Sequence, residues 1–132
     1  MPSARDQTGR PPLLEVRVIA GGGGPAVLEA SGELDLSTVT ELREPLLDRI
    51  GEGMPIVLDL TEVSFIDSSG IAVMLEALRS APGAPAGLNT VVAPESQVAR
   101  VLAVAGVDRA LKIFAGRDEA LRALRGGQGT PG

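Results

Sequence analysis

Two serines and an aspartate stand side by side at Asp67, Ser68 and Ser69, between an apolar run that precedes them and another that follows. Hydroxyl and carboxylate side chains at the start of a helix are routine caps for its unpaired backbone N–H groups. A cap needs only one such side chain, so the turn holds more oxygen atoms than capping requires. Two interpretations follow, a purely structural cap or a site that is modified or bound.

Phosphorylation is the chemistry that this turn is suited to accept. A helix N-terminus carries a partial positive charge and favours a phosphate. A phosphoserine adds about −1.5 to −2 charges and strong acceptor oxygens. Ser68 is therefore the candidate acceptor, with Ser69 as the neighbour that competes with it, whereas the structural interpretation leaves Gly70 the role of permitting close packing.

The helix predicted after the turn indicates where a partner would dock. Its large apolar residues recur at helical spacing, and on a wheel of 100° per residue the stripe is centred between Ile71 and Leu78. Val73 falls nearly opposite that stripe, so we expect its side chain to face solvent. An exposed aliphatic residue beside a serine-bearing turn predicts a docking face.

Catalysis by this chain is disfavoured by its inventory of side chains. The sequence contains no cysteine and no histidine, which excludes Cys–His and Ser–His–Asp arrangements. The turn also lacks the first glycine of a nucleophile elbow. Asp59, at the end of an apolar run, is a conceivable aspartyl-phosphate acceptor, but a solvated aspartate flanking a strand is far commoner. We expect no enzyme, no cofactor and no metal site.

Composition and charge limit the kinds of partner that this chain is expected to bind. The chain has 132 residues, a net charge of −5 and a sequence pI of about 4.7, which disfavours binding to a nucleic-acid phosphate backbone. No segment approaches the ~20 apolar residues of a membrane span, and the first twelve residues have no apolar signal core. We therefore expect a cytoplasmic protein that binds neither nucleic acid nor membrane.

The elements expected in the first half of the chain are a hairpin and a helix. Residues 13–20 alternate as a half-buried strand and residues 26–32 form a second strand, joined across a glycine-rich turn. A helix over residues 37–50 is expected to start with a capping box between Thr38 and Glu41. Pro45 inside it predicts a kink.

The second half alternates strands with helices. We expect strands over residues 55–60, 88–93 and 111–114, the last a short edge strand, and a helix from residue 71. Another helix near Pro94 should bury Val98, Val101, Leu102 and Ala105 and stop at Gly106, with an apolar contact from Val107, and Asp118 should cap a final helix ending at Arg125. Strands that alternate with helices predict parallel pairing, hence an α/β fold in one domain over residues 13–125, with disordered tails at 1–12 and 126–132.

Two motifs make the sequence resemble a known family. GELDLST at residues 32–38 and VLDLTEVSFIDSSGIAVML at residues 57–75, in this order and at this separation, resemble the STAS family. Within that family the chain is most similar to the bacterial anti-sigma-factor antagonists, over roughly residues 13–125. The resemblance implies a small mixed β-sheet, with an N-terminal hairpin and then alternating helices and strands, and helices packed against it.

The resemblance also implies a switching mechanism. The first serine of the turn, here Ser68, would be phosphorylated by an anti-sigma factor that is also a serine kinase. Asp35, in the GELD motif, would lie near the acceptor and assist the kinase contact. The unphosphorylated protein would bind the anti-sigma factor and free a sigma factor. A serine phosphatase of the metal-dependent class would reverse the modification, with ATP bound by the kinase alone.

The residues expected to bind a partner follow from the serine turn with its helix and from the family resemblance together. They are Asp35, Asp67, Ser69, Gly70 and Val73. A second hypothesis is a STAS scaffold subunit of a lipid-transport or stress-signalling complex, without switching. The Asp–Ser–Ser turn disfavours that alternative. A neighbouring gene would discriminate between them, because the first predicts a histidine-kinase-like ATPase and the second predicts transporter subunits.

Overall fold

The computed structural model describes residues 13–20, 24–80 and 87–126. Two strands form the predicted antiparallel hairpin, β1 (Leu14–Ala20) and β2 (Ala26–Leu34). Gly32 in β2 has φ +116, and a Cβ there would lie 2.1 Å from the Leu13 backbone oxygen. A side chain is therefore excluded where the GELD motif passes the start of β1. The disordered tail expected at residues 1–12 lies outside the described residues, as do residues 21–23 of the expected turn.

Within the described residues, nine elements follow one another in the predicted order. They are the two hairpin strands, then α1 (Val39–Gly51), β3 (Ile56–Ile66), α2 (Ser68–Arg79), β4 (Leu88–Val91), α3 (Gln97–Ala105), β5 (Ile113–Phe114) and α4 (Arg117–Gly126). The sheet order is β1-β2-β3-β4-β5, and every pair after the hairpin is parallel. The predicted α/β fold with a mixed sheet is confirmed.

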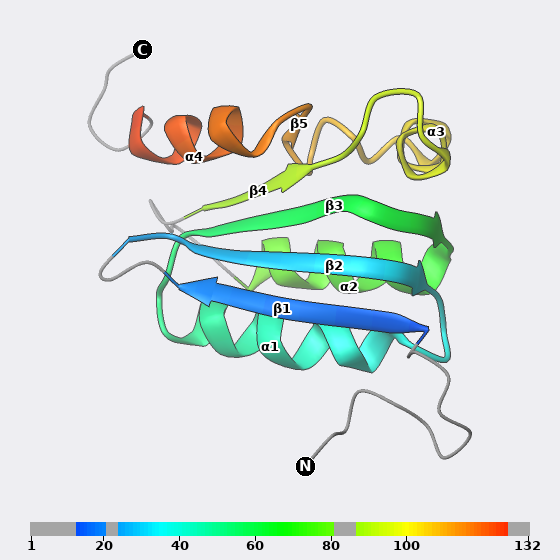
Figure 1. The fold of residues 1–132 in the computed structure, drawn as a ribbon, viewed down its shortest axis with the longest axis horizontal. Coiled ribbons are helices and arrows are strands. Elements are labelled where there is room, and N and C mark those ends of the chain that lie inside the picture. The colour runs from blue at the N-terminus through cyan, green and yellow to red at the C-terminus, as the bar shows by residue number, and fades with distance from the viewer. Residues whose placement is uncertain (1–12, 21–23, 81–86, 127–132) are drawn as a thin grey trace.

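Side chains alternate between the two faces of the sheet, as the period of a strand requires. Leu28 and Leu58 belong to the main core, which also receives buried residues of α1, α2 and α3. Val27 and Val57 point the other way and pack with Ala120 and Leu124 of α4. Figure 1 shows α1 and α2 behind the strands and α4 beside β4, so part of the sheet facing the viewer is left without a helix over it.

The β3 strand is longer than expected. Its first five residues, Ile56 to Leu60, are buried, as predicted for a strand covered on both faces. The strand then continues to Ile66. In this second part Val63 and Ile66 are still buried, whereas the residues between them are exposed. The polar residues in the segment TEVSFI, residues 61–66, lie on the uncovered face of the sheet. They do not mark the end of the strand.

The start of α1 differs from the expected capping box. Thr38 stands at the N-cap position without a side-chain cap hydrogen bond. Its hydroxyl donates instead to the Glu33 carbonyl oxygen at 2.7 Å and accepts from the Asp35 N–H at 3.0 Å. The capping box is therefore wrong, because the Thr38 oxygen is already engaged with the preceding loop. The helix continues through Pro45 without a break, as predicted, while the expected kink at this residue stays a prediction.

The last two helices test four further expectations. Gly106 ends α3 with φ +77, and the Val107 N–H donates to the Leu102 carbonyl oxygen at 3.1 Å, which is a Schellman closure and confirms the predicted stop. Val98 and Leu102 are buried as predicted, but Val101 is only half-buried, and Ala105, the last residue of the helix, is exposed. Asp118 is in the first turn of α4 rather than at its cap, because that helix begins at Arg117, one residue before Asp118.

Candidate functional site

The ends of two neighbouring parallel strands bring the GELD motif and the serine turn together. Leu34, the last residue of β2, pairs with Ile66, the last residue of β3. Asp35 and Asp67 are the residues that follow this pair, and the Asp67 N–H donates to the Leu34 carbonyl oxygen at 3.2 Å. The carboxyl ends of parallel strands are where α/β folds place their sites. The structure thus joins the two motifs that the sequence separates by about thirty residues.

Within the serine turn, the capping role falls to Asp67. Its Oδ1 accepts from the Ser69 N–H at 2.8 Å and from the Gly70 N–H at 3.4 Å. Ser68 is the first helical residue of α2 and is exposed, while Ser69 is half-buried. The Asp67 carboxylate therefore caps the helix, and the Ser68 hydroxyl has no capping role.

Gly70 is buried and serves close packing. A Cβ at this position would lie 2.8 Å from Leu34 Cγ and 2.9 Å from Ile66 Cγ1. Such distances are below those of real Cβ contacts, so only glycine lets the first turn of α2 rest on the ends of β2 and β3. The structural interpretation of this residue holds, and its burial argues against a direct contact with a partner.

The prediction that Val73 faces solvent is wrong. Its side chain is only 6% exposed, and it shares the buried face of α2 with Gly70, Met74 and Ala77. The wheel centred the stripe on the large residues Ile71 and Leu78, which are half-buried on the flank of the helix. The small residues set the rotation instead, because the closest approach to the sheet occurs where side chains are smallest. Val73 is therefore not part of a docking face.

Asp35 organises the loop between β2 and α1. Its Oδ1 accepts from the Ser37 N–H at 2.9 Å and from the Ser37 hydroxyl at 2.7 Å, and its carbonyl oxygen accepts from the Val39 N–H at 2.9 Å. The hydrogen bond from the Ser37 hydroxyl is the main cause that lowers the pKa of the Asp35 carboxyl. Asp35 is thus half-exposed, charged and fixed in place at the edge that carries Ser68.

Two exposed apolar side chains at this edge were missed from the sequence. Leu36 is 78% exposed in the loop after Asp35, and Phe65 is 40% exposed one residue before the end of β3. In the sequence, Leu36 stands within the GELDLST motif and Phe65 within the longer motif that precedes the turn, and neither pattern indicates exposure. The available signal was the position of Leu36 in a polar turn, where a leucine has no core to enter.

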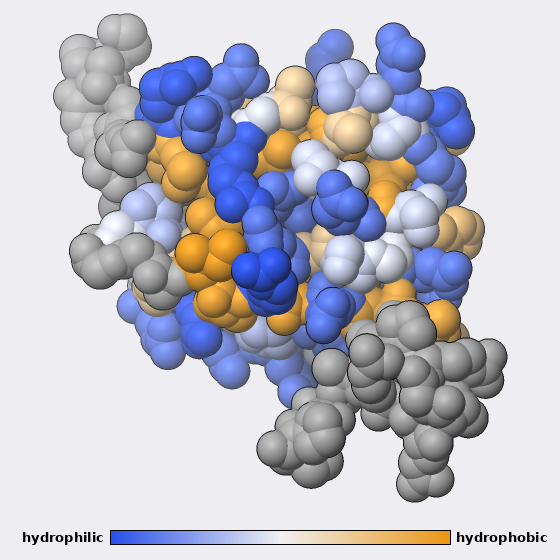
Figure 2. Space-filling model, in the orientation of Figure 1, coloured by the Kyte–Doolittle hydropathy of each residue, from blue (hydrophilic) through white to orange (hydrophobic). Residues whose placement is uncertain are grey.

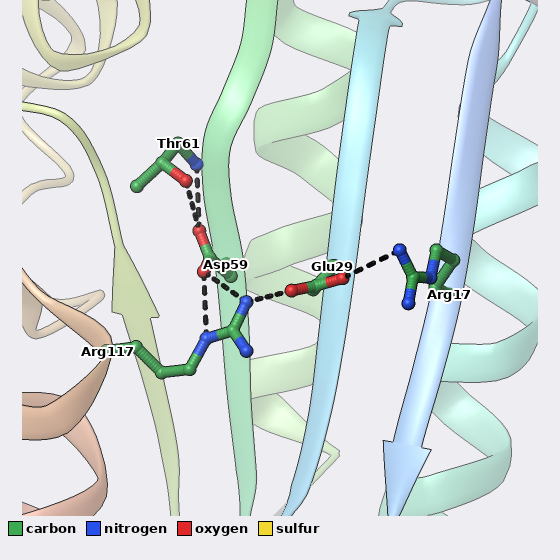
Figure 3. Close-up of polar contacts among 5 residues, drawn as sticks. All are labelled: Arg17, Glu29, Asp59, Thr61 and Arg117. Atoms are coloured by element: carbon green, nitrogen blue, oxygen red, sulfur yellow. Dashed lines mark hydrogen bonds and ion pairs between the residues drawn. The ribbon is translucent and has the colours of Figure 1, made fainter.

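A separate cluster of charges lies on the sheet near α4 (Figure 3). Asp59 Oδ1 accepts from the Thr61 N–H and hydroxyl at 2.9 and 2.8 Å, and its Oδ2 accepts from Arg117 Nε at 3.1 Å and Nη2 at 2.9 Å. Arg117 also binds Glu29, which in turn faces Arg17 at 3.7 Å. Both oxygens of Asp59 are therefore occupied by protein groups.

Asp59 is not the solvated, strand-flanking aspartate that the sequence suggested. It lies inside β3 with its side chain 8% exposed. Burial raises the pKa of this carboxyl, but the hydrogen bonds from Thr61 and Arg117 outweigh burial and leave the pKa below its usual value. A buried carboxylate with both oxygens engaged is poorly placed to accept a phosphoryl group, so its role is structural.

Two other kinds of site are absent from the described residues. None of the acidic side chains there gathers into a group of three that could ligate a metal ion. None of the helices there combines the length and the apolarity that a membrane crossing requires.

Comparison with known proteins gives one family. The family model described as "Mlab, STAS domain" matches residues 19–114. The anti-sigma-F factor antagonist RsfB of Mycobacterium tuberculosis is 32% identical over 111 residues, which cover 83% of this chain and 89% of RsfB.

Solved structures show the same fold. An anti-sigma factor antagonist from Mycobacterium paratuberculosis superposes with a TM-score of 0.78 at 24% identity, covering 85% of this chain and 94% of the other. SpoIIAA of Bacillus in its phosphorylated form gives a TM-score of 0.64 at 22% identity, covering 84% of this chain and all of the other. The matched family model, the sequence similarity and the shared fold agree, and this chain belongs to the STAS-domain family.

Proposed function

We propose that this protein is an anti-sigma-factor antagonist that is switched by phosphorylation of Ser68. In its unphosphorylated form it binds an anti-sigma factor that is also a serine kinase, and so releases a sigma factor. Transfer of the γ-phosphoryl group from the kinase's ATP to the Ser68 hydroxyl ends that binding. A metal-dependent serine phosphatase hydrolyses the phosphoserine and restores it. The protein itself acts as a binding module and substrate in the cytoplasm.

The observation that carries this proposal is the division of labour in the turn. A serine at a helix start is ordinarily explained as a cap. Here Asp67 makes the capping hydrogen bonds, and Ser68 is exposed at the first helical position. Capping therefore does not explain the serine at position 68. Its exposure makes the hydroxyl accessible to a kinase.

Electrostatics allow the modified form to stay folded while its surface changes. A phosphate on Ser68 lies at the N-terminus of a twelve-residue helix, where the helix dipole favours negative charge. The same phosphate adds a strongly hydrated group to a surface that would otherwise be covered by the partner. Its desolvation opposes binding.

The relatives support the same role. RsfB and the Mycobacterium paratuberculosis protein are both named anti-sigma factor antagonists, and SpoIIAA has been solved in a phosphorylated form. These names support an antagonist in general, and the assignment of the acceptor to Ser68 rests on the turn described above.

Phosphate transfer from radiolabelled ATP by the cognate anti-sigma factor kinase tests the acceptor. We expect labelling of the wild-type chain and of Ser69→Ala, and no labelling of Ser68→Ala. The two variants remove neighbouring hydroxyls of the same turn. Ser69→Ala therefore controls for a general disturbance of the turn by a serine-to-alanine change. Labelling of Ser68→Ala at the wild-type level would move the acceptor to another residue and refute the assignment.

A non-switching scaffold is the second candidate. The observation in its favour is that the matching family model is described by Mlab rather than by an antagonist. A scaffold subunit of a lipid-transport or stress-signalling complex would copurify with the other subunits whether or not Ser68 is replaced by Ala. The antagonist should copurify with an ATP-binding anti-sigma factor, and phosphorylation should remove it.

A further inference from the structure

Few large apolar side chains are exposed on the described part of this molecule, and two of them lie at the end of the sheet that carries the serine turn. Large hydrophobic residues that reach substantial exposure are Leu13, Ile19, Leu36, Phe65 and Val104. Figure 2 shows hydrophobic colour in small groups among hydrophilic side chains, including the right-hand edge, where β2 and β3 end. A single exposed leucine is ordinary on a protein surface, but Leu36, which is 78% exposed, lies at the same end of the sheet as a second exposed apolar side chain, Phe65.

Sheet register places Leu36 and Phe65 at the end of the sheet that carries Ser68. Leu36 and Ser68 each stand two residues beyond the paired residues Leu34 and Ile66. Phe65 precedes Ile66 and pairs with Glu33 on the neighbouring strand. The two apolar side chains therefore belong to the same end of the sheet as the acceptor hydroxyl.

The two segments that carry these side chains are acidic and contain no lysine or arginine near this end of the sheet. Glu33, Asp35 and Asp67 lie at this end of the sheet. The sequence has no lysine or arginine from residue 29 to residue 42, nor from residue 59 to residue 78. None of these three carboxylates forms an ion pair within the described residues. The chemistry that complements this surface is an apolar contact surrounded by basic side chains.

We propose that Leu36 and Phe65 are the apolar anchors on which the anti-sigma factor kinase docks beside Ser68, and that basic side chains of the kinase meet the surrounding carboxylates. This inference rests on the proposed function. It explains how the kinase holds the acceptor: a few buried apolar contacts supply most of the affinity, and the charges align the two surfaces. Phosphorylation adds a hydrated, doubly charged group at the same end of the sheet and opposes the burial of the anchors.

Binding of the purified anti-sigma factor kinase to full-length variants, measured by isothermal titration calorimetry, tests the anchors. Leu36→Ser and Phe65→Ser should each raise the Kd by about tenfold or more. Val104→Ser is the matched control, because Val104 is 89% exposed but lies near the C-terminal end of α3. It is about 10 Å along the helix from Gln97, whose side-chain oxygen accepts from the Ile66 N–H at the end of β3. Its Kd should equal that of the wild-type chain. Thermal unfolding of each variant shows that the fold is intact.

A charge-reversal pair tests the basic partner. Glu33→Lys should raise the Kd by about tenfold and reduce the dependence of binding on salt. Asp48→Lys is the control, since Asp48 is exposed in the second half of α1 and its replacement should leave the Kd unchanged.

The outcomes separate the inference from the function on which it rests. If the kinase binds and labels the wild-type chain, but Leu36→Ser and Phe65→Ser bind as tightly as the wild type, the anchors are wrong and the proposed function stands. The anchors are also wrong if Val104→Ser loses as much affinity as they do. If the kinase neither binds nor labels the wild-type chain, both proposals fail.

Discussion

At the scale of single residues, each of the four residues of the serine turn has a different role. Asp67 caps α2, Ser68 is presented to solvent, Ser69 donates its N–H to the cap, and Gly70 lets the helix approach the sheet. A turn of this kind fixes the backbone on both sides of a hydroxyl while leaving the hydroxyl accessible. That combination suits a residue that a kinase must reach without unfolding its substrate.

Replacement of Gly70 tests the close approach of helix and sheet. Gly70→Ala should lower the free energy of unfolding by about 1–3 kcal/mol, because the added methyl group overlaps Leu34 and Ile66. Gly51→Ala is the control in α1: nothing lies within 4 Å of a Cβ there, and alanine should be neutral or stabilising by up to about 1 kcal/mol. Urea unfolding measures both. Equal stability of the two variants would contradict the packing described for Gly70.

At the scale of elements, the rotation of α2 decides which residues a partner can touch. The buried face contains two small residues, Gly70 and Ala77, together with Val73 and Met74. Ile71 and Leu78 lie on the flank and are half-buried. The side of the helix available to a partner is therefore narrower and more polar than the sequence pattern indicates.

An aspartate scan across neighbouring positions checks this rotation. Val73→Asp should unfold the protein or cost several kcal/mol, because it buries an unpaired charge. Ala72→Asp, one residue earlier and exposed, should change the free energy of unfolding by less than about 0.5 kcal/mol. Circular dichroism and urea unfolding suffice. A well-folded Val73→Asp would restore the rotation that the sequence pattern suggested.

The attachment of α4 depends on different forces from those that hold α1 and α2. Ala120 and Leu124 enter a small apolar cluster on the opposite face of the sheet, and the Asn89 side-chain amide donates to the Ala120 carbonyl oxygen at 2.9 Å. Arg117 adds the ion pairs with Asp59 and Glu29 at the N-terminal end of the helix. With so few apolar contacts, the charged cluster is a significant part of what holds α4.

Replacing Arg117 tests the charged cluster and its dependence on pH. At pH 7, Arg117→Gln should cost about 1–2 kcal/mol, a value reduced for the partial exposure of the guanidinium. The folded protein lowers the pKa of Asp59, so this stability is present above the unfolded pKa of about 4 and is lost as the pH falls through the lower, folded value. The difference from the wild type should therefore shrink in acid.

Arg122→Gln serves as the control for this experiment, since Arg122 is exposed on the same helix. Its free energy of unfolding should match that of the wild-type chain at every pH. A constant difference between Arg117→Gln and the wild type from pH 7 to about pH 3 would show that the Asp59 pair does not carry the pH dependence.

At the scale of the whole molecule, the sequence was sufficient for the fold and only partly sufficient for the site. Periodicity and order gave the hairpin and the alternation of strands and helices, because each element buries its own apolar pattern. The polar half of β3 was missed, since Thr61 and Ser64 lie where no helix covers the sheet. The exposure of Leu36 and the burial of Val73 depend on how elements pack, which spacing alone does not determine.

The central claim is that Ser68 switches the binding of a partner. The most direct measurement is the affinity of the purified anti-sigma factor kinase for the unmodified chain and for the chain phosphorylated at Ser68, titrated side by side. Unmodified protein should bind and displace the sigma factor, while the phosphorylated protein should bind at least about tenfold more weakly and leave the sigma factor bound. Ser68→Asp should fall between them, because it carries one negative charge where phosphoserine approaches two. Equal affinity of the unmodified and phosphorylated chains would contradict the account.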